Sequence, residues 1–525
     1  MPKLGISFAP GGAGRPRRWL IGALACWLAG CAVGPNYHPV EAPMPQGFIA
    51  SPGSSKTAGT TANKINEAVV DPAKWWEALK DPELDSLVGR AVKGNPDIEI
   101  ALDRMQEARM EEAVVLGTAL PEMEAGAGGG IGSGSDLSRG RASYPLVSAD
   151  RTEKTGQITN VAGFDAAWEL DLFGKYRRRL EAAKYDSQAA LAARNAVLIS
   201  VIADVARAYV DLRAFQMQLA VLEKNMKTSR DYLDLTRERF ERGITNELDV
   251  TLAQRELSTL AAQKEPLVAQ IHAAQYVIAV LLGKFPEDFG DELEKTAMIP
   301  ELPEKIDAGL PLDLLRRRPD IREAEREVGS ATARIGAATA DLFPHVWLTG
   351  GAGIQVSASP NIASAIGSFG PALSWALLDF GTLDALVNIA DLRGKEALAS
   401  YKQTVLGAVR EVDTSIESYA AQQDELKNLD AAVEAALRAV SLANQRYDRG
   451  LTDSLNVIDA ERQEYALEAQ YVSSRQAAAE QFIVLYKALG GGWKEYQSFP
   501  PLRKPRPAVL AAFERLLSPD DSPKE

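Results

Sequence analysis

The feature that most constrains this chain is a long stretch that occurs twice. Residues 445–465, QRYDRGLTDSLNVIDAERQEY, repeat residues 238–257, ERFERGITNELDVTLAQREL, which lie 207 positions earlier. In each copy a polar helical pattern stops at a glycine, Gly450 or Gly243, and an apolar helical pattern resumes within a few residues. Glycine tolerates the left-handed backbone that a C-terminal helix cap requires. The sequence therefore predicts two helical hairpins, each with a tight tip.

The offset of 207 holds well beyond the tips. Trp168 matches Trp375 and Gly283 matches Gly490, and no insertion is needed between these positions. Because an insertion would rotate the buried face of a helix, a constant register indicates long helices in both copies. As one helix, residues 175–242 would be about 100 Å long. Helices of that length fit the wall of a tube better than an ordinary globular domain.

Two further segments in each half predict strands. Residues 158–170 alternate between apolar and polar side chains, with Trp168 on one face and Glu169 on the other. One apolar face that carries tryptophan and one polar face are what a membrane-barrel strand requires. In the second half, residues 346–356 are rich in glycine. The alternation that follows them falls on Phe369, Leu373, Trp375 and Leu377.

The number of predicted strands limits how the sheet can close. Each half supplies one strand pair, so the chain has four strands. Four strands cannot close a cylinder, and lipid does not tolerate unpaired strand edges. The strands therefore belong either to a soluble sandwich or to a barrel shared by several chains. Long helices that leave the same strands favour the shared barrel, because helices and strands would then continue one tube.

The first thirty residues read as a targeting segment. Three arginines within residues 15–18 precede the apolar run 19–29, and Cys31 follows. This order resembles a bacterial lipoprotein signal peptide that is cut before Cys31, whose thiol then carries a diacylglycerol. The alternative is an ordinary cleaved signal with an incidental cysteine. The other cysteine, Cys26, lies in the removed segment, so the mature chain cannot form an internal disulfide.

Composition and motifs argue against several function classes. The net charge is −13, and the first thirty residues carry only basic charge, so the mature chain is more acidic still. An acidic chain has no electrostatic case for binding nucleic acid. The histidines at positions 38, 272 and 345 are scattered and lack metal-ligand spacing. Phosphate-loop, nucleophile-elbow and dinucleotide-binding motifs are not found. We expect neither an enzyme nor a bound cofactor.

A combination of motifs carries a family resemblance. LLRRRPDIREAERE and ARIGAATADLFP are followed by SWALLDFG and by RYDRGLTDSLNVIDAER. Together they resemble the outer-membrane efflux family of TolC-like channels, and CAVGPNYHPV with Trp75-Trp76 resembles its NodT-like lipoprotein branch. The resemblance covers essentially the whole mature chain. It implies an α+β fold and a homotrimer, with a twelve-stranded outer-membrane β-barrel (four strands per chain), a long periplasmic α-helical barrel and an equatorial domain.

The resemblance also implies a function and partners. The protein would be the outer-membrane exit duct of a tripartite efflux system, lipid-anchored in the outer membrane and extending into the periplasm. Small molecules would arrive from an inner-membrane pump of the RND type through a periplasmic adaptor (membrane fusion protein). One alternative is a type I protein-secretion duct, and another is a periplasmic coiled-coil adaptor or scaffold protein. An adaptor typically has one helical hairpin, whereas this chain has two.

By the same resemblance, the periplasmic aperture lies at the hairpin tips. Asp459 matches a family aspartate that lines the aperture, and Leu455 matches an apolar constriction residue. Asn456 falls where the TolC protein has a second aspartate, so this chain departs from a double acidic ring. Asp249 is interpreted as the matching residue of the first repeat. Three converging Asp459 carboxylates would attract cations, while the simpler interpretation of Asp459 is a solvated helix residue.

The tips also resemble the grooves that receive the helical hairpin of an adaptor. A polar groove between coiled helices suits such docking. Helix capping accounts for the same residues, and both roles can hold together. The residues concerned are Arg239, Gly243, Thr245, Arg446, Gly450 and Thr452.

These observations divide the chain into six parts. The parts are the signal peptide (1–30), a lipidated tether (31–74), the first repeat (75–283), an equatorial connector (284–311), the second repeat (312–490) and a C-terminal equatorial tail (491–525).

Overall fold

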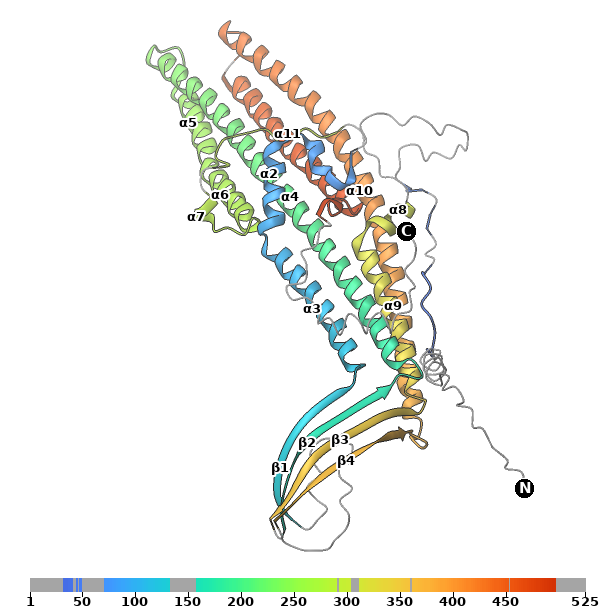
Figure 1. Ribbon diagram of the computed structural model, residues 1–525. Helices are drawn as coiled ribbons and strands as arrows, with labels where there is room; N and C mark the ends of the chain where they lie inside the picture. The colour runs from blue at the N-terminus through green and yellow to red at the C-terminus, as the bar shows by residue number, and fades with distance from the viewer. Residues whose placement is uncertain are drawn as a thin grey trace, which may run out of the picture.

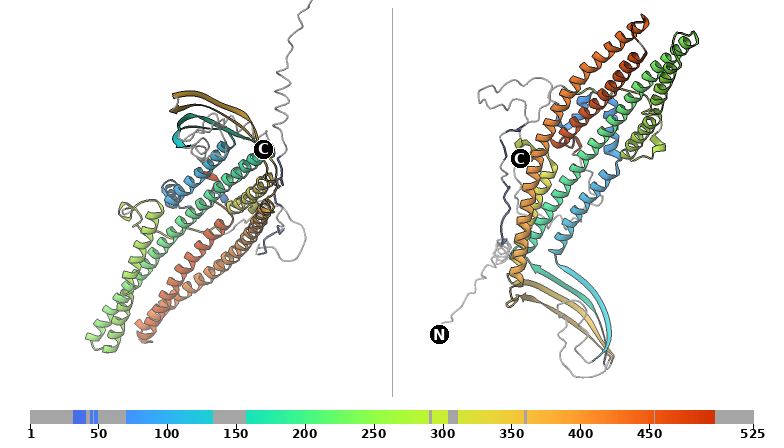
Figure 2. Two further views of the ribbon diagram at one scale, coloured as in Figure 1. Left: turned by 90° about the horizontal axis from the view of Figure 1, so that it is seen from below. Right: turned by 180° about the vertical axis from the view of Figure 1, so that it is seen from behind.

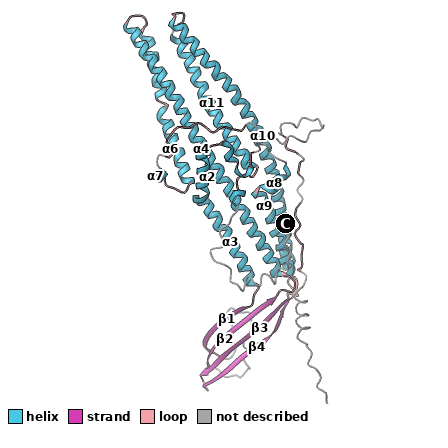
Figure 3. Ribbon diagram, turned by 45° about the horizontal axis from the view of Figure 1, so that its top comes forward, coloured by secondary structure: helices cyan, strands magenta, loops and turns pink. Residues whose placement is uncertain are grey.

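The chain forms an elongated body with a four-stranded sheet at one end and two helical hairpins that reach away from it (Figure 1). Both hairpin tips lie at the end opposite the sheet, and the views from below and behind agree (Figure 2). The hairpins lie side by side along their length (Figure 3). The computed structural model describes residues 32–40, 44–45, 47–49, 70–132, 157–289, 292–303, 311–358, 361–452 and 454–496.

Each repeat contributes one very long helix and a return. Helices α4 (Lys175–Glu241) and α10 (Thr382–Asp448) have 67 residues each, which corresponds to about 100 Å. The second hairpin returns as the single helix α11 (Ser454–Ala488). The first returns as α5 (Glu247–Ala261) and α6 (Lys264–Leu281). The long helices are confirmed for both repeats.

The first return helix is interrupted, which the constant register did not predict. The interruption falls at Ala262 and Gln263, between α5 and α6. Pro266 follows within the first turn of α6. It has no N–H for the carbonyl of Ala262, and its ring clashes with that carbonyl in a continuous helix. The equivalent position of the second repeat is Ser473, and α11 continues through it.

The sheet has the strand order β1-β2-β3-β4, and all three pairings are antiparallel. The strands of the first repeat are β1 (Glu122–Gly132) and β2 (Gln157–Leu170), and those of the second are β3 (His345–Ala358) and β4 (Asn361–Ser374). β2 and β3 pair although the whole first hairpin separates them in sequence. The sheet thus joins the two repeats.

The two faces of the sheet differ in polarity. Directly opposed residues, such as Phe164 with Ala352 and Phe369 with Gly350, lie on one face, and alternate residues along a strand share a face. This register confirms the predicted apolar and polar faces. One face carries the exposed side chains of Met123, Phe164, Phe369 and Leu373. The opposite face carries Glu122, Glu124, Asp165, Glu169 and Ser368.

Strand β4 ends earlier than the alternation predicted. Trp375 and Leu377 lie beyond it, in a turn where the N–H of Leu377 donates to the carbonyl of Trp375 (3.1 Å). The carboxylate of Asp379 then accepts hydrogen bonds from the N–H groups of Gly381 (3.2 Å) and Leu383 (2.7 Å). The longer strand was a wrong prediction, because capping of α10 takes the backbone out of the sheet.

Shorter elements pack along the long helices, from their middle down to the sheet (Figure 1). Trp75 stacks on Tyr486 (ring centroids 6.1 Å apart) and meets Phe482 edge-on in the main core. One 18-residue stretch of α4 is apolar enough to cross a membrane, and 61% of it is buried in this packing. The shorter elements are η1 (Pro72–Leu79), α2 (Pro82–Gly94), α3 (Pro96–Thr118), α7 (Pro286–Phe289), α8 (Pro311–Arg317), α9 (Pro319–Ala340) and η2 (Lys494–Tyr496).

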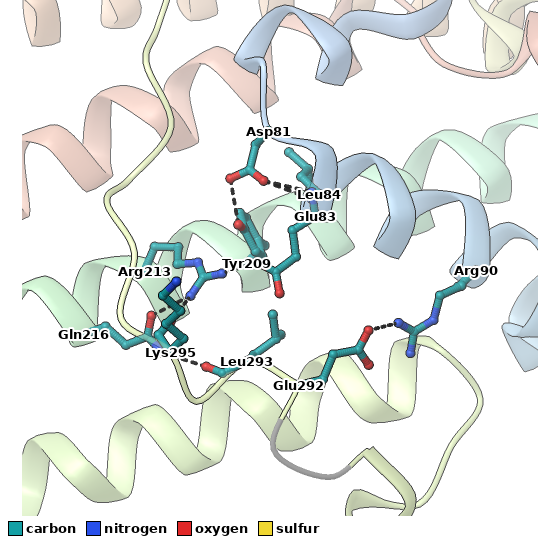
Figure 4. A network of polar contacts seen from close by, with 10 residues as sticks. All are labelled: Asp81, Glu83, Leu84, Arg90, Tyr209, Arg213, Gln216, Glu292, Leu293 and Lys295. Carbon is teal, nitrogen blue, oxygen red and sulfur yellow. Dashed lines mark hydrogen bonds and ion pairs between the residues drawn. The ribbon is translucent and has the colours of Figure 1, made fainter.

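A buried arginine fastens α2 and the connector onto α4 (Figure 4). Arg213 is 1% exposed; one of its amino groups lies 2.5 Å from the carboxylate of Glu83, and the other donates to the carbonyl of Lys295 (2.8 Å). Its guanidinium lies 4.8 Å from the ring centroid of Tyr209, whose hydroxyl donates to Asp81 (2.6 Å). A charge buried this deeply is tolerated because it is paired and hydrogen-bonded.

The beginning of the predicted tether is held against the body. The N–H of Val33 donates to the carbonyl of Phe173 (3.1 Å), and Arg178 donates to the carbonyl of Val33 (3.1 Å) and to the side chain of Asn36 (2.7 Å). The segment therefore starts beside the junction of β2 and α4. Cys31 and the tail beyond residue 496 lie outside the described residues.

Candidate functional site

Both hairpin tips end their long helix in the same way. In the first tip the N–H of Ile244 donates to the carbonyl of Arg239 (2.8 Å), and in the second the N–H of Leu451 donates to the carbonyl of Arg446 (2.9 Å). This bond closes a Schellman motif, which needs a left-handed residue just before the donor. Gly243 fills this position in the first tip, with a φ of 73°, and Gly450 fills it in the second, with a φ of 68°.

The helices that leave the tips begin with matching side-chain contacts. Asn246 caps α5 by accepting a hydrogen bond from the N–H of Asp249 (3.1 Å), and the carboxylate of Asp249 bonds the hydroxyl of Thr245. In the second tip Asn456 donates to the hydroxyl of Thr452 (2.8 Å). Asp249 therefore corresponds to Asn456 at the offset of 207. The asparagine preserves the local contact with threonine but removes a charge.

Leu455 and Asp459 lie one turn apart on the same face of α11. Leu455 is 58% exposed, and Asp459 is exposed and has no hydrogen bond or ion pair within the described part of the chain. Val457 and Ile458, which are 0% and 5% exposed, occupy the face that packs on the first hairpin. Leu455 and Asp459 therefore point away from the first hairpin. The first-repeat counterpart of Asp459 at the offset of 207 is Leu252, so the interpretation of Asp249 as its match was wrong.

The basic residues of the two tips have different surroundings. The guanidinium of Arg239 lies 4.4 Å from the ring centroid of Tyr447 and so connects α4 to α10. Arg446, its counterpart in the repeat, is exposed. Arg446 is therefore more accessible to a partner than Arg239 is. Apolar side chains, which the sequence reasoning passed over, are exposed at both tips and include Ile244, Leu248 and Leu451.

A small apolar cluster holds the tip halves of the hairpins together. It lies apart from the main core, which contains most of the other buried apolar residues. Segments with few buried contacts open locally at low free-energy cost. The tip halves therefore have less buried apolar packing to hold them than the middle of the body has. The buried members of the cluster are Tyr232, Leu233, Ala253, Val457 and Ile458.

Charged side chains line the boundary between the two hairpins, and sequence reasoning missed them. The ammonium group of Lys224 on α4 lies 3.2 Å from Glu464 and 2.7 Å from Glu468 on α11. Arg462 on α11 lies 3.4 Å from Glu256 on α5. Glu464 and Glu468 fall on the same helical face as the buried Val457. Charged residues on an otherwise apolar helical face could have predicted these ion pairs from the sequence.

A polar cluster joins the sheet to the helices. The ring of His345, at the start of β3, lies 2.5 Å from the carboxylate of Glu169, which also accepts a hydrogen bond from the hydroxyl of Tyr176 (2.8 Å). Lys175 and Asp341 form an ion pair at 2.7 Å. These contacts link the ends of β2 and α9 to the starts of β3 and α4, so they set the angle between sheet and helices.

The comparisons with known proteins agree with this architecture. The model of the family described as "Outer membrane efflux protein" matches residues 87–284 and 310–491. Nodulation protein T of Rhizobium leguminosarum bv. trifolii is 31% identical over 471 residues, which cover 89% of this chain and 95% of that protein. The toluene efflux pump outer membrane protein TtgC of Pseudomonas putida is 30% identical, over 89% of this chain and 94% of that protein.

Solved structures give the same result. The outer-membrane channel OprN superposes with a TM-score of 0.77 at 33% identity, over 88% of this chain and 100% of that chain. The open state of the MtrE outer membrane channel of Neisseria gonorrhoeae superposes with a TM-score of 0.72 at 25% identity, over 89% of this chain and 100% of that chain. The soluble-sandwich and adaptor alternatives are therefore wrong. The chain belongs to the outer membrane efflux protein family, as a trimeric channel whose helices extend from the outer membrane into the periplasm.

Proposed function

We propose that this channel serves as the exit duct for small molecules that an inner-membrane pump of the RND type delivers through a periplasmic adaptor. The Pseudomonas relatives are named as outer membrane proteins of efflux pumps, among them a toluene efflux pump. This favours small-molecule efflux over protein secretion. The duct itself supplies no energy: its walls hold the substrate path, and the pump drives transport.

Closure of the duct at the hairpin tips is the second part of the proposal. The observation that carries it is the placement of Leu455 and Asp459 on the face of α11 that points away from the first hairpin. In a closed ring of three chains that face turns toward the threefold axis. Three Leu455 side chains would then narrow the opening, and three Asp459 carboxylates would attract cations at its mouth. Asn456 would add no charge to this ring.

Planar-bilayer recordings test the closure. Replacing Asp459 with Ala removes three charges and should lower cation affinity at the mouth, while Leu455→Ser should loosen the apolar contact. The double variant should raise single-channel conductance more than either single variant, because neighbours in one ring couple. Asp249→Ala is the control, since Asp249 lies on the first hairpin and binds Thr245. Equal conductance in the wild type and the double variant would refute this position of the aperture.

We propose that the adaptor docks at the same end. Arg446, Gly450 and Thr452 of the second tip and Arg239, Gly243 and Thr245 of the first would line its grooves. The exposed Arg446 makes the second tip the stronger electrostatic contact. Arg446→Glu should therefore weaken binding of the purified adaptor more than Arg239→Glu does. Surface plasmon resonance would measure both, and the reverse order would contradict this assignment.

Cys31 completes the proposal as the lipid anchor. The first described residues after it lie against the junction of sheet and helix, where Val33 bonds Phe173. An acyl chain on Cys31 would therefore start at the level where the barrel leaves the membrane. Metabolic labelling with a radioactive fatty acid should mark the wild type and not Cys31→Ser. Label that persists in the variant would remove Cys31 as the anchor.

A further inference from the structure

One carboxyl group at the boundary between the two hairpins takes no part in the ion pairs that connect them there. Glu461 lies on α11 one turn after Val457, so it faces the first hairpin rather than the aperture. It is half-buried and, among the described residues, has neither a hydrogen-bond nor an ion-pair partner. It differs in this from Asp459, which is exposed on the other face. An unpaired carboxyl between packed helices is costly to ionise.

A small cavity lies beside Glu461 where three helices meet. Its volume is about 20 Å³, enough for one water molecule. α4 contributes Asn225, Thr228 and Ser229, and α5 contributes Glu256 and Leu260; α11 adds Ile458, Glu461, Arg462 and Tyr465. The cavity therefore spans both hairpins. A gap at this point lets the carboxyl keep or lose a proton without first separating the helices.

The charges around Glu461 are mostly acidic. Glu256 approaches from α5, and Glu464 lies on α11 itself. The nearby cations are engaged elsewhere: Arg462 pairs with Glu256, and Lys224 on α4 pairs with Glu464 and Glu468. Two further pairs lie on the neighbouring helices: Lys264 of α6 with Glu223 of α4 (2.8 Å) and, at the exposed surface of α10, Arg438 with Glu434.

We propose that Glu461 is a proton-dependent latch between the two hairpins. When protonated it is neutral and packs against Glu256 of the first hairpin; when ionised it repels Glu256, and this favours separation of the second hairpin from the first. Burial, and then the charges of Glu464 and Glu256, raise the pKa of Glu461 to about 7. In a separated state water would surround the carboxyl and return its pKa toward about 4.5.

These two pKa values set the direction of the pH response. Between about pH 4.5 and pH 7 the packed state holds one proton more per chain than the separated state. The packed state is therefore favoured in acid and loses that advantage as the pH rises. The ratio of packed to separated hairpins falls by at most tenfold per pH unit for each chain. The consequence for transport, easier opening above neutral pH, rests on the proposed closure of the duct at its tips.

A distance measurement across the boundary tests the latch. Nitroxide labels on Thr259→Cys of α5 and Gln463→Cys of α11, both exposed sites, report the separation by double electron–electron resonance in the intact detergent-solubilised trimer. In the otherwise unchanged protein the shortest distance should lengthen between pH 5.5 and pH 8. In Glu461→Gln, which mimics the protonated carboxyl, it should stay short at both pH values. A wild type without a pH response, or a Glu461→Gln variant with the wild-type response, would overturn the latch.

Glu323→Gln is the matched control. Glu323 on α9 also has its pKa raised to about 7, by burial and by Glu327 and Asp320, but it lies outside the tip cluster. Glu323→Gln should keep the full pH-dependent change in distance. If this variant lost the change, the titrating proton would lie on α9 and the proposal would be overturned. Glu461→Leu provides a second neutral variant and should also stay short. The distance between the labels does not depend on conduction. If the distance responds to pH but the Leu455 and Asp459 double variant conducts like the wild type, only the proposed aperture is contradicted.

Discussion

At the scale of single residues, the repeated glycines have unequal roles. Gly450 has a φ of 68°, and a Cβ there would meet no atom within 4 Å. Gly490 has a similar φ of 73°, but a Cβ would lie 3.0 Å from the backbone of Arg317 and Arg318. The first glycine is needed for its conformation alone. The second is needed for its conformation and for the close approach of another chain segment.

We therefore expect Gly450→Ala to lower the free energy of unfolding by about 1–2 kcal/mol, because alanine is strained in the left-handed conformation. Gly490→Ala should lower it clearly more. Gly407→Ala in the middle of α10 is the control: it meets no atom within 4 Å and should stabilise the helix by about 1 kcal/mol. The apparent unfolding temperature of the detergent-solubilised protein measures all three. Equal losses at positions 450 and 490 would contradict the role of the close contact.

At the scale of elements, the two faces of the sheet should respond differently to charge. Phe369 lies on the apolar face and is 80% exposed, while its neighbour Ser368 lies on the face that carries Asp165. In a barrel the apolar face meets lipid and the polar face lines the lumen. Phe369→Arg should destabilise the folded barrel by about 2–4 kcal/mol if the residue lies near the membrane midplane, and by less if it lies near an interface. Ser368→Arg should be tolerated.

The yield of folded trimer extracted from outer membranes distinguishes the two variants. A low yield for Phe369→Arg with a normal yield for Ser368→Arg is the expected result. The opposite order would mean that the faces are reversed.

At the scale of the whole molecule, one protomer is incomplete. β1 and β4 are the outer strands of its sheet, and large apolar side chains such as Leu392 on α10 and Val280 on α6 are exposed. A heterologous contact repeated around a threefold axis closes both edges. The stability of the folded protomer therefore depends on assembly. Each titratable residue occurs once in each of the three protomers.

We expect the stability of the trimer to decrease as the pH rises from about 5 to about 7. The raised pKa of Glu323, like that of Glu461, means that the folded state binds more protons than the unfolded state in this range. Each copy contributes at most about 1.4 kcal/mol per pH unit, and less because these sites are only half-buried. Glu323→Gln should flatten the pH profile of the apparent unfolding temperature. A profile identical to the wild type would show that Glu323 does not titrate there.

Features that depend on local periodicity could be predicted from the amino-acid sequence alone. The offset of 207 places both tips, the glycines at 243 and 450 stop the long helices, and alternation identifies the two faces of β2. These follow from repeats of 3.6 and 2.0 residues along one segment. The family resemblance then suggested the hairpin tips as the candidate site, and the comparisons confirmed the family. The early end of β4 and the interruption before Pro266 were missed because a cap and a proline override periodicity locally.

The residues that lie opposite each face could not be predicted from periodicity and became known from the packing of the helices and strands. Periodicity places Asp459 and Glu461 on different sides of α11, but it does not say that Glu461 meets Glu256 on α5. The pairing of β2 with β3 and the burial of Arg213 against Glu83 likewise join segments far apart in the chain. The physical reason is that a helix or strand sets the direction of its own side chains, whereas their partners, charges and access to water depend on the packing of other segments.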